Sequence, residues 1–225
     1  MPNLTLLVYT LAALVITITI HEFFHAWIAF ELGDPTARYM GRLTLNPVAH
    51  FDPLGALMIL FMSFSGRGIG WGKPVPVNPN NLRNGPIVGG AMVSVAGPLS
   101  NLLVAALVAI PLRLMYYYGF PGGGLPDHVA LFLVILFRTS VLLAMFNLLP
   151  IPPLDGYDFW MGILHQLPFG ATRRLWMTLS ADAVRMYGPM AMLILVFWAQ
   201  GVLWSILNPP YQLIVTLFLG FPLGF

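Results

Sequence analysis

The chain has 225 residues, of which 58% are hydrophobic and 8% are charged, and its mean hydropathy is +0.82. A water-soluble domain of this size could not hydrate so apolar a surface. The composition therefore predicts an all-α polytopic membrane protein, with one membrane-embedded domain over residues 1–225. The net charge of +2 excludes the basic surface of a nucleic-acid-binding protein, and the absence of cysteine excludes disulfides and thiolate metal ligands.

The first predicted element is a long helix from Leu4 to Leu32, which ends at the turn Gly33-Asp34-Pro35. No basic residue precedes its apolar run, and the apolar pattern continues through residues 26–30. We therefore predict a retained membrane span rather than a cleaved signal peptide.

The second half of this helix contains the sequence His21-Glu22-Phe23-Phe24-His25. Two histidines four residues apart lie on one face of a helix and can bind a single metal ion together. Glu22 points about 100° away from that direction, which suits it to act as a general base on a metal-activated water rather than as a ligand. Charged groups are costly inside an apolar run, so the pattern indicates a metal site.

Two polar stretches, residues 36–53 and 69–80, flank a short apolar segment at Leu54–Phe64. The first stretch alternates at residues 39–45, and the prolines of Trp71–Asn78 in the second forbid a helix. Both are predicted to be strands or loops, which together form a small membrane-associated β/loop region. Leu54–Phe64 is too short to cross a bilayer and is predicted to insert only partly.

Two long spans are predicted next. Pro86–Tyr118 carries small residues along its first half, which allow neighbouring helices to approach closely, so we expect it to be the central helix. Val129–Leu149 follows and contains Arg138, for which we expect either a functional role or a local partner, such as a backbone carbonyl.

The C-terminal third is predicted as four pieces. Thr172–Val184 resembles an interfacial helix, Met186–Leu207 a further span, Asn208–Pro210 a turn, and Tyr211–Phe225 a short apolar segment. The whole chain is therefore expected to form about five or six transmembrane or partly inserted helices.

Basic residues set the predicted orientation. Arg113 lies on one side of the bilayer, and most other basic residues lie on the side where the first helix ends. That side is predicted to be cytoplasmic, with the N-terminus outside and the metal site near the cytoplasmic face of the cell membrane. The residues counted on the cytoplasmic side are Arg38, Arg42, Arg67, Lys73, Arg83, Arg173, Arg174 and Arg185.

Catalytic zinc usually takes three protein ligands and leaves one position for water. Asp155 is the best candidate for the third ligand, because an acid at a membrane face is costly unless it is paired or bound to a metal. The alternative is that Asp155 caps the helix that follows it. His50 and Asp52 are rival ligands, outer partners of the site or structural residues of a loop.

Three motifs resemble those of the site-2 protease family, a family of intramembrane zinc metalloproteases. They are HEFFH at residues 21–25, AGPLSN at residues 96–101 and NLLPIPPLDG at residues 147–156. The chain leaves no room for the PDZ or CBS domains of larger members, so the short members are the better comparison.

The resemblance implies a role for five side chains. One zinc ion would be bound by His21, His25 and Asp155, with Glu22 as the catalytic glutamate. Asn147 matches an asparagine that orients substrate or stabilises the oxyanion.

The predicted activity is zinc-dependent hydrolysis of peptide bonds in or near the transmembrane segments of single-pass membrane proteins, within the lipid bilayer. The substrate helix must unwind first, and residues 39–45 or 73–78 are predicted to offer an edge for the released backbone. The alternative function is a metal-ion transporter, or another metal-binding membrane protein, that uses the same His/His/Asp cluster.

Overall fold

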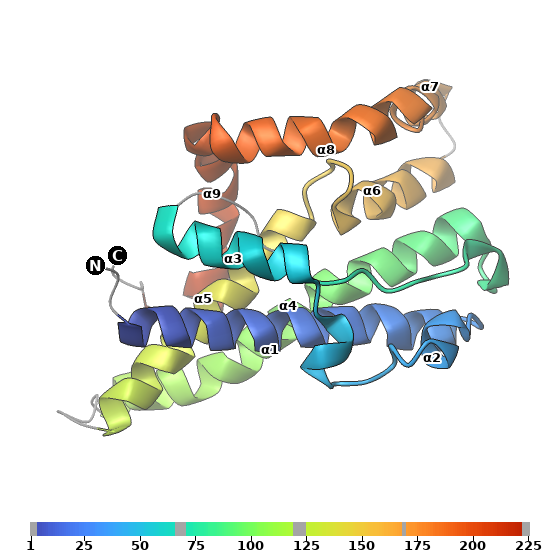
Figure 1. The fold of residues 1–225 in the computed structure, drawn as a ribbon. Helices are drawn as coiled ribbons and strands as arrows, with labels where there is room; N and C mark the ends of the chain where they lie inside the picture. Colours follow the sequence, from blue (N-terminus) through green and yellow to red (C-terminus); the bar gives the residue numbers. More distant parts are fainter. Residues whose placement is uncertain (1–3, 66–70, 119–124, 168–169, 222–225) are drawn as a thin grey trace.

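The computed structural model describes residues 4–65, 71–118, 125–167 and 170–221. These residues form helices and contain no strand, so the predicted all-α polytopic membrane fold is confirmed (Figure 1). Their helices are α1 Leu4–Glu31, α2 Thr36–Tyr39, α3 Pro53–Ser65, α4 Pro86–Tyr118, α5 Leu125–Asn147, α6 Asp155–Gln166, α7 Gly170–Leu179, α8 Asp182–Phe197 and α9 Gln200–Leu219, with short 3-10 helices η1 at Pro47–His50 and η2 at Pro79–Asn81.

Four of the described helices are long and apolar enough to cross a membrane, namely α1, α4, α5 and α9. Helices α7 and α8 are bent by 68° at the break between them and would form a fifth crossing if they act as one span. The chain is therefore a multi-pass membrane protein. The shorter helices α3 and α6 accompany these spans.

Helix α4 is the central helix, as predicted, because it packs against α1, α5 and α6. Helix α4 crosses behind α1 in the view of Figure 1, and the two helices are in contact. Small residues permit the close contacts: a Cβ atom added to Gly162 of α6 would come within 2.3 Å of the Ala91 Cβ on α4. The two helices that carry the candidate metal ligands, α1 and α6, are thus both held against α4.

The apolar core lies between α4, α5 and α9 and includes Phe137, Leu112 and Val215. A polar contact crosses the bundle from α1 to α5, where the buried Thr17 and Ser140 hydroxyl oxygens lie 3.3 Å apart. Because apolar helices gain little from the hydrophobic effect inside a bilayer, close packing and such hydrogen bonds hold the bundle together.

The C-terminal helices differ from the prediction. The expected interfacial helix at Thr172–Val184 is divided between α7 and α8, and the expected span at Met186–Leu207 is divided between α8 and α9. The expected turn at Asn208–Pro210 is wrong, because all three residues lie inside α9. Proline has a helical φ angle, and in an apolar bundle a break would leave more backbone groups unpaired than the proline itself removes.

The two polar stretches predicted as strands or loops are loops among the described residues. Residues 36–53 contain α2 and η1, and residues 71–78 run as an extended chain toward the start of α4 (Figure 1). We call residues 71–78 the extended segment. The predicted short helix at Leu54–Phe64 is α3, which begins at Pro53.

Asp34, just beyond the end of α1, fixes the extended segment in place. This fully buried carboxylate accepts hydrogen bonds from the Thr36 hydroxyl at 2.5 Å, the Asn78 backbone N–H at 2.7 Å and the Asn81 side-chain amide at 2.9 Å. Burial alone would raise the pKa of Asp34, but these hydrogen bonds outweigh it and lower the pKa below its ordinary value.

The lowered pKa predicts an acid-sensitive fold. Because the folded pKa lies below the unfolded one, Asp34 stabilises the protein fully above about pH 4 and loses that contribution as the pH falls through the folded value. Asp34→Asn removes one acceptor oxygen and should lower the free energy of unfolding by about 1–3 kcal/mol. Thermal unfolding in detergent between about pH 2 and pH 7, a range that extends well below the ordinary pKa of a carboxyl group, should have a flatter pH dependence in the variant. An unchanged slope would contradict the assignment.

Candidate metal centre

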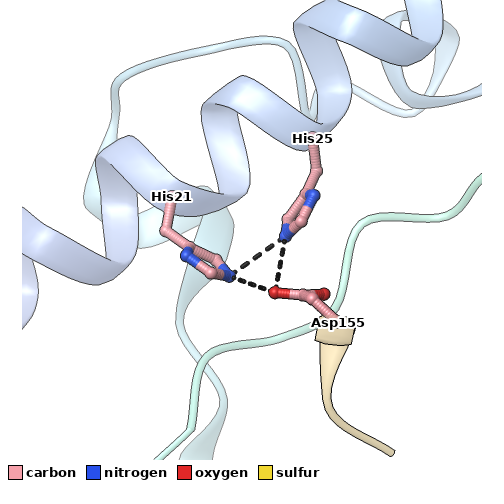
Figure 2. A group of neighbouring side chains, drawn as sticks. All are labelled: His21, His25 and Asp155. Atoms are coloured by element: carbon pink, nitrogen blue, oxygen red, sulfur yellow. Dashed lines mark hydrogen bonds and ion pairs between the residues drawn. The ribbon is translucent and has the colours of Figure 1, made fainter. Parts of the chain in front are cut away.

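His21 and His25 lie one turn apart on α1 and are both buried. Their Nε2 atoms are 3.0 Å apart, and the two rings meet edge to face. The Asp155 carboxylate oxygen Oδ2 lies 3.0 Å from the Nε2 atom of His21 and 3.4 Å from that of His25. Figure 2 shows the three side chains converging on one point from α1 and from the start of α6.

The turn between α5 and α6 delivers Asp155 to the histidines. Gly156 packs so closely on this turn that a Cβ atom there would lie 2.3 Å from the carbonyl carbon and oxygen of Leu148. The N-cap residue of α6 is Leu154, which makes no side-chain capping bond, and Asp155 is the first residue of the helix. The carboxylate therefore faces the histidines rather than capping its own helix.

The far side of each imidazole is also held. The Nδ1 atom of His25 lies 2.8 Å from the Val93 carbonyl of α4, and since a carbonyl only accepts, this Nδ1 carries the hydrogen. The Nδ1 atom of His21 lies 3.0 Å from the side-chain amide of Asn101, which is fully buried. Both rings consequently direct Nε2 toward the Asp155 carboxylate.

The donor set fits a zinc ion. One ligand atom from each of His21, His25 and Asp155 lies within 4.8 Å of the others, and two imidazoles with one carboxylate form a known ligand set of catalytic zinc. Gly97 of α4 makes room beside the rings, because a Cβ atom there would come within 2.4 Å of the His25 Nε2 atom. Lone pairs on facing Nε2 atoms would repel each other, so a shared cation suits this arrangement.

Glu22 points elsewhere, as the helical geometry predicts. Its carboxylate oxygen Oε2 accepts a hydrogen bond of 3.1 Å from the Val75 backbone N–H in the extended segment. Glu22 is not a member of the His21/His25/Asp155 group, although all four side chains line one cavity of about 630 Å³.

Asn147 lines the same cavity at the end of α5. Its side-chain amide donates a 3.0 Å hydrogen bond to the Leu143 carbonyl one turn earlier in the helix. Asn147 is therefore beside the metal centre and tied to its own helix, with its amide nitrogen already engaged.

The rival ligands lie outside the cluster. His50 is buried, with Nε2 2.8 Å from the Thr44 carbonyl, and Asp52 accepts a 2.7 Å hydrogen bond from the Gly55 N–H at the start of α3. Both contacts are those of structural loop residues. Arg138 interacts with Tyr211 of α9, which gives it a partner within the bundle.

Asn101 is a site residue that the sequence alone does not identify, because the AGPLSN motif indicates a family resemblance but gives this side chain no partner. Its side-chain oxygen is buried without a hydrogen-bond partner among the described residues, while its nitrogen faces the His21 Nδ1 atom. A half-turn of the amide exchanges the two atoms. The oxygen then accepts the Nδ1 hydrogen that His21 must carry when Nε2 binds a metal. An asparagine within an apolar span was the available signal.

The fold and the cluster define a class: a multi-pass membrane metalloprotein with an HExxH helix and a distant carboxylate ligand. Comparison with known proteins identifies the family within this class. The chain is 37% identical over 218 residues to the Bacillus subtilis protein named "Putative zinc metalloprotease YwhC", a match that covers 96% of this chain and 93% of that protein. It is also 34% identical over 157 residues to "Putative zinc metalloprotease Rip2" of Mycobacterium tuberculosis, over 67% of this chain and 55% of that relative.

No protein-family model matches the chain, and no solved structure matches it significantly. The identity to the Bacillus subtilis relative extends over almost the full length of both proteins. The chain therefore belongs to the site-2 protease family of zinc metalloproteases.

The position of Asn101 predicts that it fixes the tautomer of His21. Asn101→Leu leaves the Nδ1 hydrogen of His21 without an acceptor and should weaken zinc binding about 10–100-fold. Asn101→Asp still provides an acceptor and should bind zinc much more tightly than the leucine variant. Competition with a fluorescent chelator measures both affinities in detergent. If the aspartate variant binds zinc as weakly as the leucine variant, Asn101 does not act as an acceptor.

Proposed function

We propose that this protein is a zinc-dependent intramembrane endopeptidase that hydrolyses peptide bonds in or near the transmembrane segments of single-pass membrane proteins. The observation that carries the proposal is the convergence of Asp155 with His21 and His25 inside a bundle of apolar spans. Membership of a zinc metalloprotease family supports hydrolysis as the reaction, and one zinc ion as the cofactor.

The proposed chemistry assigns one role to each group. A zinc ion held by His21, His25 and Asp155 would supply a Lewis acid for the substrate carbonyl and for water. The Glu22 carboxylate takes the proton from the attacking water and delivers it to the departing amine nitrogen, so the peptide bond breaks with no net change in proton count. Asn147, on the same cavity wall, is available to the substrate backbone or to the developing oxyanion.

The cavity supports a substrate that enters as an unwound chain. Its walls include residues of α1, α4, α5, the extended segment, α6 and α8, and α8 contributes Pro189, Met192 and Leu193. A helical substrate satisfies its own backbone groups and hides its peptide bonds, so it must open locally before hydrolysis. Of the two edges predicted from the sequence, only the extended segment lines the cavity, and residues 39–45 are not among its lining residues. The extended segment is thus the better candidate for contacting the substrate backbone.

We place the protein in the cell membrane, and the distribution of basic residues supports an orientation with the metal centre toward the cytoplasm. Arg38, Arg42 and Arg83 lie in the loops near the end of α1, whereas Arg113 lies near the far end of α4. Positive loops remain on the cytoplasmic side. Cysteine labelling from either side, using this naturally cysteine-free chain, tests the orientation.

The decisive variant is Glu22→Gln. Glutamine fits the same space but cannot take a proton, so peptide hydrolysis should fall by about 10²–10⁴-fold while the zinc content stays at one ion per chain. Cleavage of a transmembrane reporter substrate in liposomes and metal analysis of the same preparation are the two measurements. His21→Ala serves as the matched control and should lose both zinc and cleavage.

A metal transporter would behave differently in the same experiment. A transporter would move zinc across the liposome membrane, and Glu22→Gln would leave this transport intact. That result, without cleavage of the reporter substrate by the wild type, would show that the protease proposal is wrong. Zinc retention with cleavage abolished agrees only with a catalytic glutamate.

A further inference from the structure

Hydrogen bonds anchor the extended segment at two points, one on either side of the residue that contacts Glu22. At its start the Lys73 N–H donates a 2.9 Å hydrogen bond to the His50 carbonyl, and the Arg42 guanidinium donates to the Lys73 carbonyl. At its end the Asn78 N–H donates to the buried Asp34 carboxylate. The segment therefore crosses the metal centre as a chain fixed at both ends.

Close packing adds to these anchors. A Cβ atom on Gly72 would lie 2.6 Å from the Ile18 side chain of α1, and one on Gly55 of α3 would lie 2.0 Å from the Trp71 carbonyl oxygen. The start of the extended segment is thus pressed between α1 and α3, one turn of α1 before Glu22. A side chain at Gly72 would push the segment away from α1, and a side chain at Gly55 would push it away from α3, so both glycines allow the close packing.

Val75 supplies the contact between this fixed chain and the glutamate. Its N–H lies 3.1 Å from Glu22 Oε2, and it stands between Pro74 and Pro76, neither of which has an N–H. Among these three consecutive residues, Val75 is the only possible backbone donor. The flanking prolines also restrict the chain to an extended conformation, which keeps this donor aimed at α1.

We propose that the Val75 backbone amide is a positioning group for the general base. It engages one carboxylate oxygen of Glu22 and stops the side chain from rotating, which leaves the other oxygen available for the attacking water. The amide does not touch the substrate or the water. The expected effect on kcat rests on the proposed function, whereas the hydrogen bond between the Val75 N–H and Glu22 does not.

The test replaces the amide of Val75 by an ester, through incorporation of the α-hydroxy analogue of valine. This exchange removes the N–H and keeps the side chain. The kcat for a transmembrane reporter substrate should fall about 10–100-fold, with the KM and the zinc content unchanged, because only the orientation of the base is lost. Val75→Pro removes the same N–H by ordinary mutagenesis and should likewise lower kcat while leaving KM unchanged.

The matched control is the same ester exchange at Arg83, which lies outside the extended segment and does not line the cavity. It removes a backbone hydrogen bond of 2.9 Å, but one that ends on the Leu32 carbonyl rather than on Glu22. The kcat of this control should therefore remain close to that of the wild type. Equal losses of kcat at Arg83 and Val75 would overturn the proposal, since both would then act by loosening the fold.

A second readout needs no substrate. The chain contains only two glutamates, Glu22 and Glu31, so ¹³C-glutamate labelling of a Glu31→Gln background isolates the Glu22 carboxylate in the infrared spectrum. The ester at Val75 should shift that band and the ester at Arg83 should not. If the wild type cleaves no substrate but the band shifts, the proposed function fails while the contact stands. If the wild type cleaves and neither kcat nor the band responds at Val75, the positioning role is wrong.

Discussion

The meeting of the Asp155 carboxylate with two imidazoles of α1 is the contact on which the rest of this structure depends. Each of the three groups would be costly in an apolar bundle if it stood alone. Together they interact with one another, and a cation bound among them would satisfy all three. The fold must therefore hold the Asp155 carboxylate 3.0 Å from the His21 imidazole, which belongs to a helix far away in the sequence. In a bilayer the fold cannot rely on the hydrophobic effect between helices to do so.

Glycine is the means by which the bundle achieves this approach. Gly97 brings α4 against the imidazole rings, Gly162 brings α6 against α4, and Gly156 folds the turn before α6 onto itself. At each position a methyl group would meet another atom at less than 3 Å. The three contacts form a chain from α1 through α4 to Asp155, so the geometry of the metal centre follows from helix packing rather than from the ligands themselves.

Sequence reasoning succeeded where a local rule determines the structure. The spacing of the histidines and the helical angle to Glu22 follow from the geometry of one helix, and the bounds of α1 and α4 follow from hydropathy and terminating residues. It failed at Pro209 and Pro210, because the rule that proline ends a helix assumes that water can take up the freed backbone groups. The apolar surroundings of α9 reverse that balance.

The parts of the site that the sequence did not reveal depend on contacts between distant segments. Asn101 touches His21 only because α4 packs against α1, and Val75 touches Glu22 only because Asp34 and Lys73 fix the ends of its segment. No periodicity within α4 or within the extended segment encodes these pairings. The sequence does contain a signal in each case. Asn101 is a polar residue in an apolar span, and Val75 is a single backbone donor between two prolines. The residue that each one contacts can be identified only from the three-dimensional structure.

The prolines of the extended segment also limit how a substrate could pair with it. In an extended chain, neighbouring residues present their backbone groups to opposite edges, so the edge that contains Val75 faces α1 and the edge that contains Pro74 and Pro76 faces away. At these two prolines the outer edge can accept hydrogen bonds but cannot donate them. A substrate backbone aligned there would have to contribute its own N–H groups, which an unwound helix provides. The same residues would thus orient the general base on one edge and restrict the register of the substrate on the other.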